Sequence, residues 1–117
     1  MVEKHLKGWG YEDWLVNNSK YCGKILHFNE GKKCSMHFHS EKDETFYLLK
    51  GEVLLEIAES KDDFYNKNIQ KIEMKAGDVF HITPSVLHRI NAKIDSDILE
   101  ISTQHKEKDS YRIVKGD

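Results

Sequence analysis

The sequence predicts an all-β barrel in one domain, and two features carry this prediction. First, short apolar runs recur along the chain, separated by glycine-containing turn segments at 29–31, 50–51 and 76–78. Second, runs such as 45–49 and 53–55 are apolar on both alternating positions, which is typical of strands covered on both faces. The expected strands are 23–28, 33–39, 45–50, 52–58, 69–74, 79–82, 87–92 and 97–103.

The remaining segments complete a single domain over residues 1–117. Proline occurs once and glycine seven times, so no linker-like stretch divides the chain. A chain of this length supports one hydrophobic core. Segment 59–68 is polar and predicts a surface loop with at most a helical turn. Residues 1 to about 20 are expected to form an N-terminal arm, in which 11–16 fits either a short helix or an extended arm.

Composition and charge exclude several classes of function. The formal net charge is −2 and the basic residues are scattered, so we expect no nucleic-acid partner. No apolar run approaches the roughly 18 residues of a membrane helix, and residues 1–10 lack the apolar segment of a secretory signal. We therefore expect a cytoplasmic protein without a membrane partner, in which Cys22 and Cys34 are reduced thiols.

Three histidines and a glutamate form the most informative constellation. His37 and His39 are two residues apart, so on a strand both point to the same face, roughly 7 Å apart. Glu44 opens the next expected strand, and His88 lies at the start of another. Three imidazoles and a carboxylate can hold a transition metal ion and leave one or two positions open. Two histidines alone are more often packed polar residues, so the prediction depends on the complete set. Cys34 is expected on the opposite face and is not a ligand.

The spacing of these residues resembles the first motif of the cupin superfamily, and segment 77–91 is similar to the second. In the second motif Thr83 and Ser85 replace the usual residues, while His88 keeps its distance from the turn at 77–78. The resemblance implies a cupin barrel, which is a double-stranded β-helix or jelly roll, with one divalent ion of Zn, Mn, Fe, Ni or Co. The first motif is matched by Gly31, His37, His39, Glu44 and Gly51.

Within the cupins, the chain resembles the cupin domain of type II mannose-6-phosphate isomerases. The similarity lies in the opening segment 7–12 and at 24–25, 44–46, 88–90 and 99–102. Gly8 replaces their proline, and those proteins often carry Gln where this chain has His37. The resemblance implies a sugar-phosphate or nucleotide-sugar ligand, and an isomerase or epimerase that acts through a metal-stabilised enediolate.

Such a reaction needs a base beside the metal, because a proton next to a carbonyl must be removed. Glu100 lies inside an apolar run and is the first candidate, although a charge on a solvated strand face fits its position equally well. His81 and Lys24 are the other candidates for proton transfer, and a packed or solvent-facing role is the alternative for each.

Three residues are candidates for substrate binding: Trp9, Lys24 and Arg89. Arg89 can bind a phosphate bidentately, but as the strand neighbour of His88 it can also face the back of the site. Trp9 can stack on a sugar ring or close the end of the barrel. Trp14 is assigned to packing, and His105 is expected on the surface.

Three functions remain open at this stage. The first is a metal-dependent sugar isomerase or epimerase, the second an Fe or Mn enzyme of the dioxygenase type, and the third a non-catalytic sugar-binding or regulatory cupin. A homodimer is also expected, since a barrel of this size buries only roughly 65–70% of its unfolded surface. The candidate interface consists of Tyr47, Leu49, Leu54 and the N-terminal arm.

Overall fold

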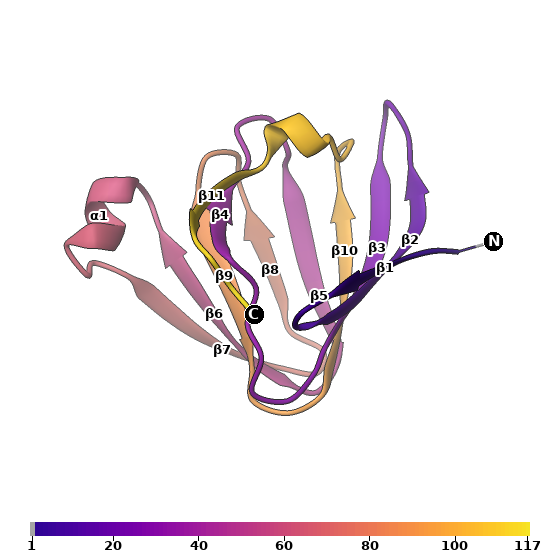
Figure 1. The fold of residues 1–117 in the computed structure, drawn as a ribbon, viewed down its shortest axis with the longest axis horizontal. Helices are drawn as coiled ribbons and strands as arrows, with labels where there is room; N and C mark the ends of the chain where they lie inside the picture. Colours follow the sequence, from indigo (N-terminus) through magenta and orange to yellow (C-terminus); the bar gives the residue numbers. More distant parts are fainter. Residues whose placement is uncertain (1) are drawn as a thin grey trace.

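The structure is a computed structural model that describes residues 2–117, and it consists mainly of two antiparallel β-sheets (Figure 1). The six-stranded sheet has the order β1 (Glu3–Lys7), β2 (Gly10–Asn17), β3 (Cys22–Phe28), β10 (Ser96–Ser102), β5 (Glu44–Lys50) and β8 (Val79–Ile82). The five-stranded sheet has the order β11 (Tyr111–Val114), β4 (Met36–Phe38), β9 (Leu87–Ala92), β6 (Glu52–Ala58) and β7 (Gln70–Lys75). The other elements are α1 (Lys61–Tyr65) and the 3₁₀ helix η1 (Glu107–Asp109). The predicted all-β class and single small domain are confirmed.

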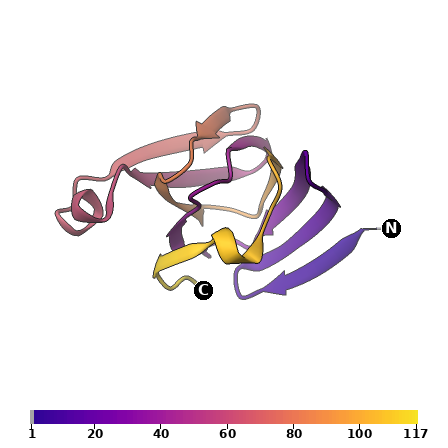
Figure 2. The ribbon, with the colours of Figure 1, turned by 90° about the horizontal axis from the view of Figure 1, so that it is seen from above.

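The two sheets face each other around a common interior (Figure 2). Strands that are distant in sequence lie side by side, since β10 pairs with both β3 and β5, and β9 pairs with both β4 and β6. The helix α1 lies at the outer end of the β6–β7 hairpin, and the β1–β2 hairpin lies on the opposite side (Figure 1). No helix within residues 2–117 is long and apolar enough to cross a membrane.

The inner face of the six-stranded sheet changes from apolar to polar along its strands. Residues paired across neighbouring strands share a face, so the register defines rows of inward side chains. One buried row across β3, β10 and β5 consists of Leu26, Ile98 and Leu48. The next row, two residues along each strand, consists of Lys24, Glu100 and Phe46, which are also buried. The polar groups of the interior therefore gather at one end.

The turn between β5 and β6 requires a glycine. Gly51 has φ +103°, in the left-handed region that other residues adopt at a cost. A Cβ at this position would lie 2.6 Å from the carbonyl oxygen of Asp95 and 2.6 Å from the Cβ of Ser96. The last glycine of the first sequence motif thus serves the turn that ends β5, while the motif's side chains lie at the start of that strand.

The structure differs from the sequence prediction at both ends of the chain and at residues 33–39. Segment 11–16, which fits a helix or an arm, lies in strand β2 and pairs with β3. The strand expected at 33–39 is shorter, since only Met36–Phe38 forms β4. Strand β11, which pairs with β4, has no counterpart in the prediction. Strands β4 and β11 are short, and segment 11–16 has no strict alternation of apolar and polar residues, so pairing with a neighbouring strand, and not their own pattern, determines their structure.

Candidate metal centre

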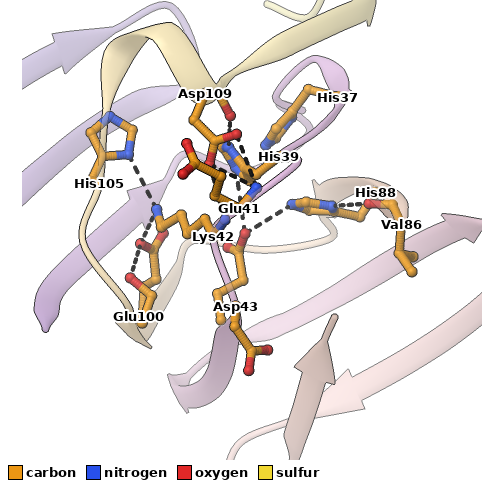
Figure 3. A network of polar contacts seen from close by, with 12 residues as sticks. His37, His39, Glu41, Lys42, Asp43, Val86, His88, Glu100, His105 and Asp109 are labelled. Carbon is orange, nitrogen blue, oxygen red and sulfur yellow. Dashed lines mark hydrogen bonds and ion pairs between the residues drawn. The ribbon is translucent and has the colours of Figure 1, made fainter. Parts of the chain in front are cut away.

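Three histidine side chains converge at the polar end of the interior. His37 on β4 pairs directly with His88 on β9, and His39 follows at the end of β4. One ring nitrogen from each histidine lies within 4.8 Å of the other two, and the ring centroids of His37 and His88 are 4.4 Å apart. Figure 3 shows the three rings turned toward the same space. Because His37 and His39 are two residues apart, both rings lie on the same side of the strand, as the sequence predicts.

Backbone carbonyl groups orient all three imidazole rings. The Nδ1 of His37 donates to the Ser35 carbonyl at 2.8 Å, that of His39 donates to the Asp109 carbonyl at 2.8 Å, and that of His88 donates to the Val86 carbonyl at 3.0 Å. Because a carbonyl oxygen only accepts, each Nδ1 carries the proton and each Nε2 keeps a free lone pair. This is the arrangement by which outer hydrogen bonds prepare histidines to bind a metal.

Glu44 adds a carboxylate to the histidine cluster. Its Oε2 lies 3.4 Å from the Nε2 of His39 and 3.6 Å from the Nε2 of His88. Among the described residues, Glu44 Oε2 and His88 Nε2 are buried without a hydrogen-bond partner. Unpaired lone pairs that face one another in a buried place are costly, and a cation among them removes that cost. The donor set therefore fits a divalent transition metal.

The protonation states of these groups agree with a cation site. Burial lowers the pKa of His37 to about 3 and the pKa values of His39 and His88 to about 4, so all three rings are neutral at pH 7. Burial, assisted by the negative charge of Glu100, raises the pKa of Glu44 to about 8. A bound divalent cation would favour the ionised form of Glu44 and the neutral form of each imidazole.

A buried ion pair lies beside the histidine cluster. The Lys42 ammonium is 2.5 Å from Glu100 Oε2 and 3.2 Å from the Nδ1 of His105 (Figure 3). Burial alone would raise the pKa of Glu100, but Lys42 and Lys24 together lower it to about 2. Burial opposes the charge of Lys42, yet Glu100 and Glu44 raise its pKa above the ordinary value. Both members of the pair are therefore charged at neutral pH.

Lys24, which is the register partner of Glu100 on the neighbouring strand, forms a second polar contact set on the same sheet. Its ammonium lies 3.4 Å from Glu12 Oε1 and 4.2 Å from the centre of the Trp14 ring. The indole nitrogen of Trp14 donates to the same Glu12 oxygen at 2.8 Å. The sequence assigns Trp14 to packing, and in the structure its ring and its indole N–H also contact the part-buried Lys24–Glu12 ion pair.

Asp109 of η1 ties the C-terminal segment to the loop between β4 and β5. Its carboxylate accepts hydrogen bonds from the backbone of Ser40, Glu41 and Lys42, and from the Ser40 hydroxyl. Its carbonyl accepts from His39. One residue therefore orients a histidine and also shapes the loop that delivers Lys42 (Figure 3).

These groups line a cavity of about 440 Å³. The structure brings together most of the side chains selected from the sequence, although their roles remain predictions. The selected residues that line the cavity are Trp9, Lys24, His37, His39, Glu44, His88 and Glu100. Cys34 also contributes to the wall, but its Sγ accepts a hydrogen bond from the Ile90 N–H at 3.3 Å and stands outside the metal-type cluster.

Two predicted site residues lie elsewhere and correct the sequence interpretation. His81 is on the outer face of β8, where its side chain is 56% exposed and its Nε2 contacts Asp43 at 2.5 Å. It does not line the cavity, so it cannot transfer protons there. Arg89 is buried behind the site, and its guanidinium donates to the carbonyls of Cys34 and Lys115. Since neighbours on a strand face opposite sides, Arg89 points away from the cavity that His88 enters.

Sequence reasoning missed Lys42, His105 and Asp109. Lys42 looks like a surface residue because it lies in a charged loop, and nothing in its neighbours distinguishes it. His105 was expected on the surface, but its side chain is only 12% exposed and lines the cavity. The positions of all three side chains depend on the packing of the segment around η1 against the β4–β5 loop. These two segments are about 65 residues apart in the sequence.

The sequence of this chain matches a known protein family. Residues 24–101 match the Cupin domain family, which is well over half of the chain, and the protein belongs to that family. The match spans the two motifs and all four residues of the metal-type constellation. No curated protein sequence matches the chain significantly.

Solved structures share the fold at low sequence identity. Oxalate decarboxylase from Bacillus subtilis has a TM-score of 0.81 and 16% identity, over 96% of this chain and 30% of that chain. The capsular polysaccharide assembling protein CapF from Staphylococcus aureus has a TM-score of 0.84 and 14% identity, over 97% of this chain and 32% of that chain. This chain thus spans about a third of each protein, and the likeness concerns the fold alone.

Proposed function

We propose that this cupin holds one divalent metal ion on His37, His39, Glu44 and His88, and isomerises or epimerises a sugar phosphate or nucleotide sugar there. The observation that carries the proposal is the set of buried, unpartnered lone pairs of Glu44 and His88 beside two further oriented imidazoles. Zn, Mn, Fe, Ni or Co suit these donors. The Mn(II) centres of the structurally similar oxalate decarboxylase support manganese as one choice.

A divalent ion held by His37, His39, Glu44 and His88 would supply Lewis acidity to a bound sugar. The chain's own residues must then move the proton. In the proposal Glu100 is the base, because it is buried, ionised and part of the cavity wall. Its contact with Lys42 makes it a weak base in the ligand-free state, since an effective base has a pKa near the working pH. A substrate hydroxyl that takes the place of Lys42 would raise the basicity of Glu100.

The remaining wall supports binding of a sugar. Lys24 and Trp9 line the cavity, and Lys24 is held by Glu12 and the ring of Trp14. Polar groups and aromatic side chains in the same cavity suit a polyhydroxylated ring, whose faces are apolar and whose rim is polar. The proposal includes a cytoplasmic homodimer with a small-molecule ligand and without a nucleic-acid partner.

The test is deuterium exchange at carbon in D₂O, followed by proton NMR, on hexose, pentose and nucleotide-linked sugars with each metal in turn. Glu44→Gln should lose exchange, because the metal loses its carboxylate ligand. Glu100→Gln should keep the metal and lose roughly 10²–10⁴-fold in rate, the usual range for an acid–base group. The matched control is His81→Gln, an exposed histidine outside the cavity, which should keep the wild-type rate.

Other outcomes separate the competing functions. Exchange at an unchanged rate in Glu100→Gln would remove Glu100 from the mechanism. No exchange on any sugar, with a ligand still bound at the loaded centre, would favour a binding or regulatory cupin. Oxygen uptake by the Fe(II)-loaded protein would favour the dioxygenase type, for which three histidines and one glutamate are also suitable donors.

A further inference from the structure

Arg112 of β11 lies on the cavity side of its strand, opposite His37 of β4. Strand β11 pairs with β4, and the register sets Arg112 against His37 and Tyr111 against Phe38. The rings of Tyr111 and Phe38 stack at 4.9 Å on one side of this pair. Because side chains alternate along a strand, Arg112 and His37 share the other side. Arg112 accordingly belongs to the cavity wall, as does His37.

The guanidinium of Arg112 has donors to offer a ligand. Among residues 2–117, no hydrogen bond or ion pair is formed by its side chain, whereas the two buried lysines of the cavity are paired with Glu12 and Glu100. A guanidinium presents five N–H donors in a fork that matches the oxygens of a phosphate. Among the described residues, Lys7 and Lys115 of the cavity wall are also unpaired, but Arg112 is the cation set against His37, and it can receive an anion without breaking an existing pair.

Arg89 gives Arg112 a fixed position. The buried guanidinium of Arg89 donates to the Cys34 carbonyl at 2.9 Å and to the Lys115 carbonyl at 3.0 Å. These bonds fasten the chain just after β11 to the segment just before β4. The arginine that the sequence suggested for substrate binding thus holds the strand that carries a second arginine to the cavity.

The charge and size of the cavity define the class of anion. Five basic and five acidic side chains line it, so their formal charges cancel, and a divalent ion leaves an excess of two positive charges. A phosphate monoester carries about −1.5 to −2 at pH 7. A cavity of about 440 Å³ is at the small end of ligand pockets, which favours a hexose phosphate over a much larger nucleotide sugar.

We propose that Arg112 binds the phosphate group of a sugar phosphate whose sugar oxygens face the three histidines. This inference rests on the proposed function and narrows its substrate class to phosphate monoesters. It also replaces Arg89 by Arg112 as the residue that selects an anionic substrate.

The experiment measures binding of inorganic phosphate to the full chain, both Mn(II)-loaded and chelated. Calorimetry gives the affinity in both states, and ³¹P line broadening by Mn(II) shows whether the phosphate lies near the metal. Arg112→Gln should weaken binding about tenfold, which is the loss of a charge-assisted contact at an accessible site. Arg112→Lys should lose less, because it keeps the charge but not the fork. Lys108→Gln, which removes an exposed cation outside the cavity, is the matched control and should bind as wild type.

The outcomes separate this inference from the proposed function. Equal phosphate affinity in Arg112→Gln and Lys108→Gln, or no binding by the wild type, would overturn the role of Arg112. Tighter competition by a nucleotide sugar than by hexose 6-phosphate would overturn the narrowed substrate class. A wild-type chain that retains no metal would refute the proposed function, while calorimetry on the chelated variants would still decide for or against Arg112.

Discussion

The interior of the barrel has two unlike ends, although the same strands build both. At one end Leu26, Ile98 and Leu48 form an apolar row, and two residues further along these strands Lys24 and Glu100 are equally buried. Removing an ion from water costs several kcal/mol even when a partner is present, and apolar residues of similar size often stabilise a fold as well or better. Stability therefore does not explain the buried charges of the polar end, and we assign these charges to function.

The largest expected effect on stability comes from dividing the buried ion pair. Glu100→Leu leaves the ammonium of Lys42 without its carboxylate partner, and we expect a loss of about 3–5 kcal/mol in the free energy of unfolding. The double variant Lys42→Met/Glu100→Leu removes both charges and should recover most of that loss. Urea unfolding of the chelated proteins measures both. A double variant as unstable as Glu100→Leu would show that this end serves the fold.

A cavity at the apolar end should damage the fold and spare the metal centre. Leu48 is fully buried, so Leu48→Ala should cost about 2–5 kcal/mol in unfolding free energy. Its exposed neighbour provides the control, because Leu49→Ala should change stability by less than about 0.5 kcal/mol. Urea unfolding and elemental analysis check the pair. Loss of metal in folded Leu48→Ala would mean that the two ends are not independent.

The metal-free protein should lose stability as the pH falls from 6.5 to 5. The three cluster histidines have folded pKa values of about 3 to 4 because they are buried, whereas the unfolded chain protonates them near 6.5. The unfolded state then binds more protons, and each histidine removes up to about 1.4 kcal/mol per pH unit. Stability linked to these groups is present above pH 6.5 and is lost on acidification.

Glu44 gives the opposite slope on the alkaline side. Burial and Glu100 raise its folded pKa to about 8, so stability linked to its proton is present below about pH 4.5 and is lost as the pH rises toward 8. The three histidines outweigh it below pH 6.5, and the chelated protein should be most stable near that pH. Urea unfolding at pH 5, 6.5 and 8 is the measurement, with His88→Gln as the control that reduces the acid slope. Equal stability at pH 5 and 6.5 would contradict this assignment.

The smallest expected effect on the single chain concerns the outer face of the six-stranded sheet. Tyr47 and Leu49 are exposed there, while Leu54, the third candidate of the predicted dimer interface, belongs to the five-stranded sheet. Tyr47→Lys should dissociate the proposed homodimer and change unfolding free energy by less than about 0.5 kcal/mol. Tyr65→Lys, which changes an exposed aromatic residue of α1 outside the candidate interface, is the matched control and should keep the dimer. Sedimentation of the wild type as a 13.7 kDa species at micromolar concentration would refute the homodimer.

The sequence predicted the fold class and the strands that carry the metal-type residues, because those strands have strong apolar patterns and the motif spacing is specific. His37 and His88 are set opposite each other by strand register alone. Lys42 and Asp109 could not be predicted, since their positions follow from the C-terminal segment packing on a polar loop. Arg89 was misassigned because a pattern gives the residue type and not the side of the strand it occupies.

The most direct test of the account is elemental analysis of the untagged protein after chelation and reloading with each divalent metal. The account predicts one ion per chain in the wild type and a stoichiometry near zero in His37→Ala/His39→Ala. Glu100→Gln, whose carboxylate contacts Lys42 and not the histidines, should retain one ion. A wild type that binds no metal, or a double histidine variant with unchanged affinity, would contradict the central claim that the polar end is a metal centre.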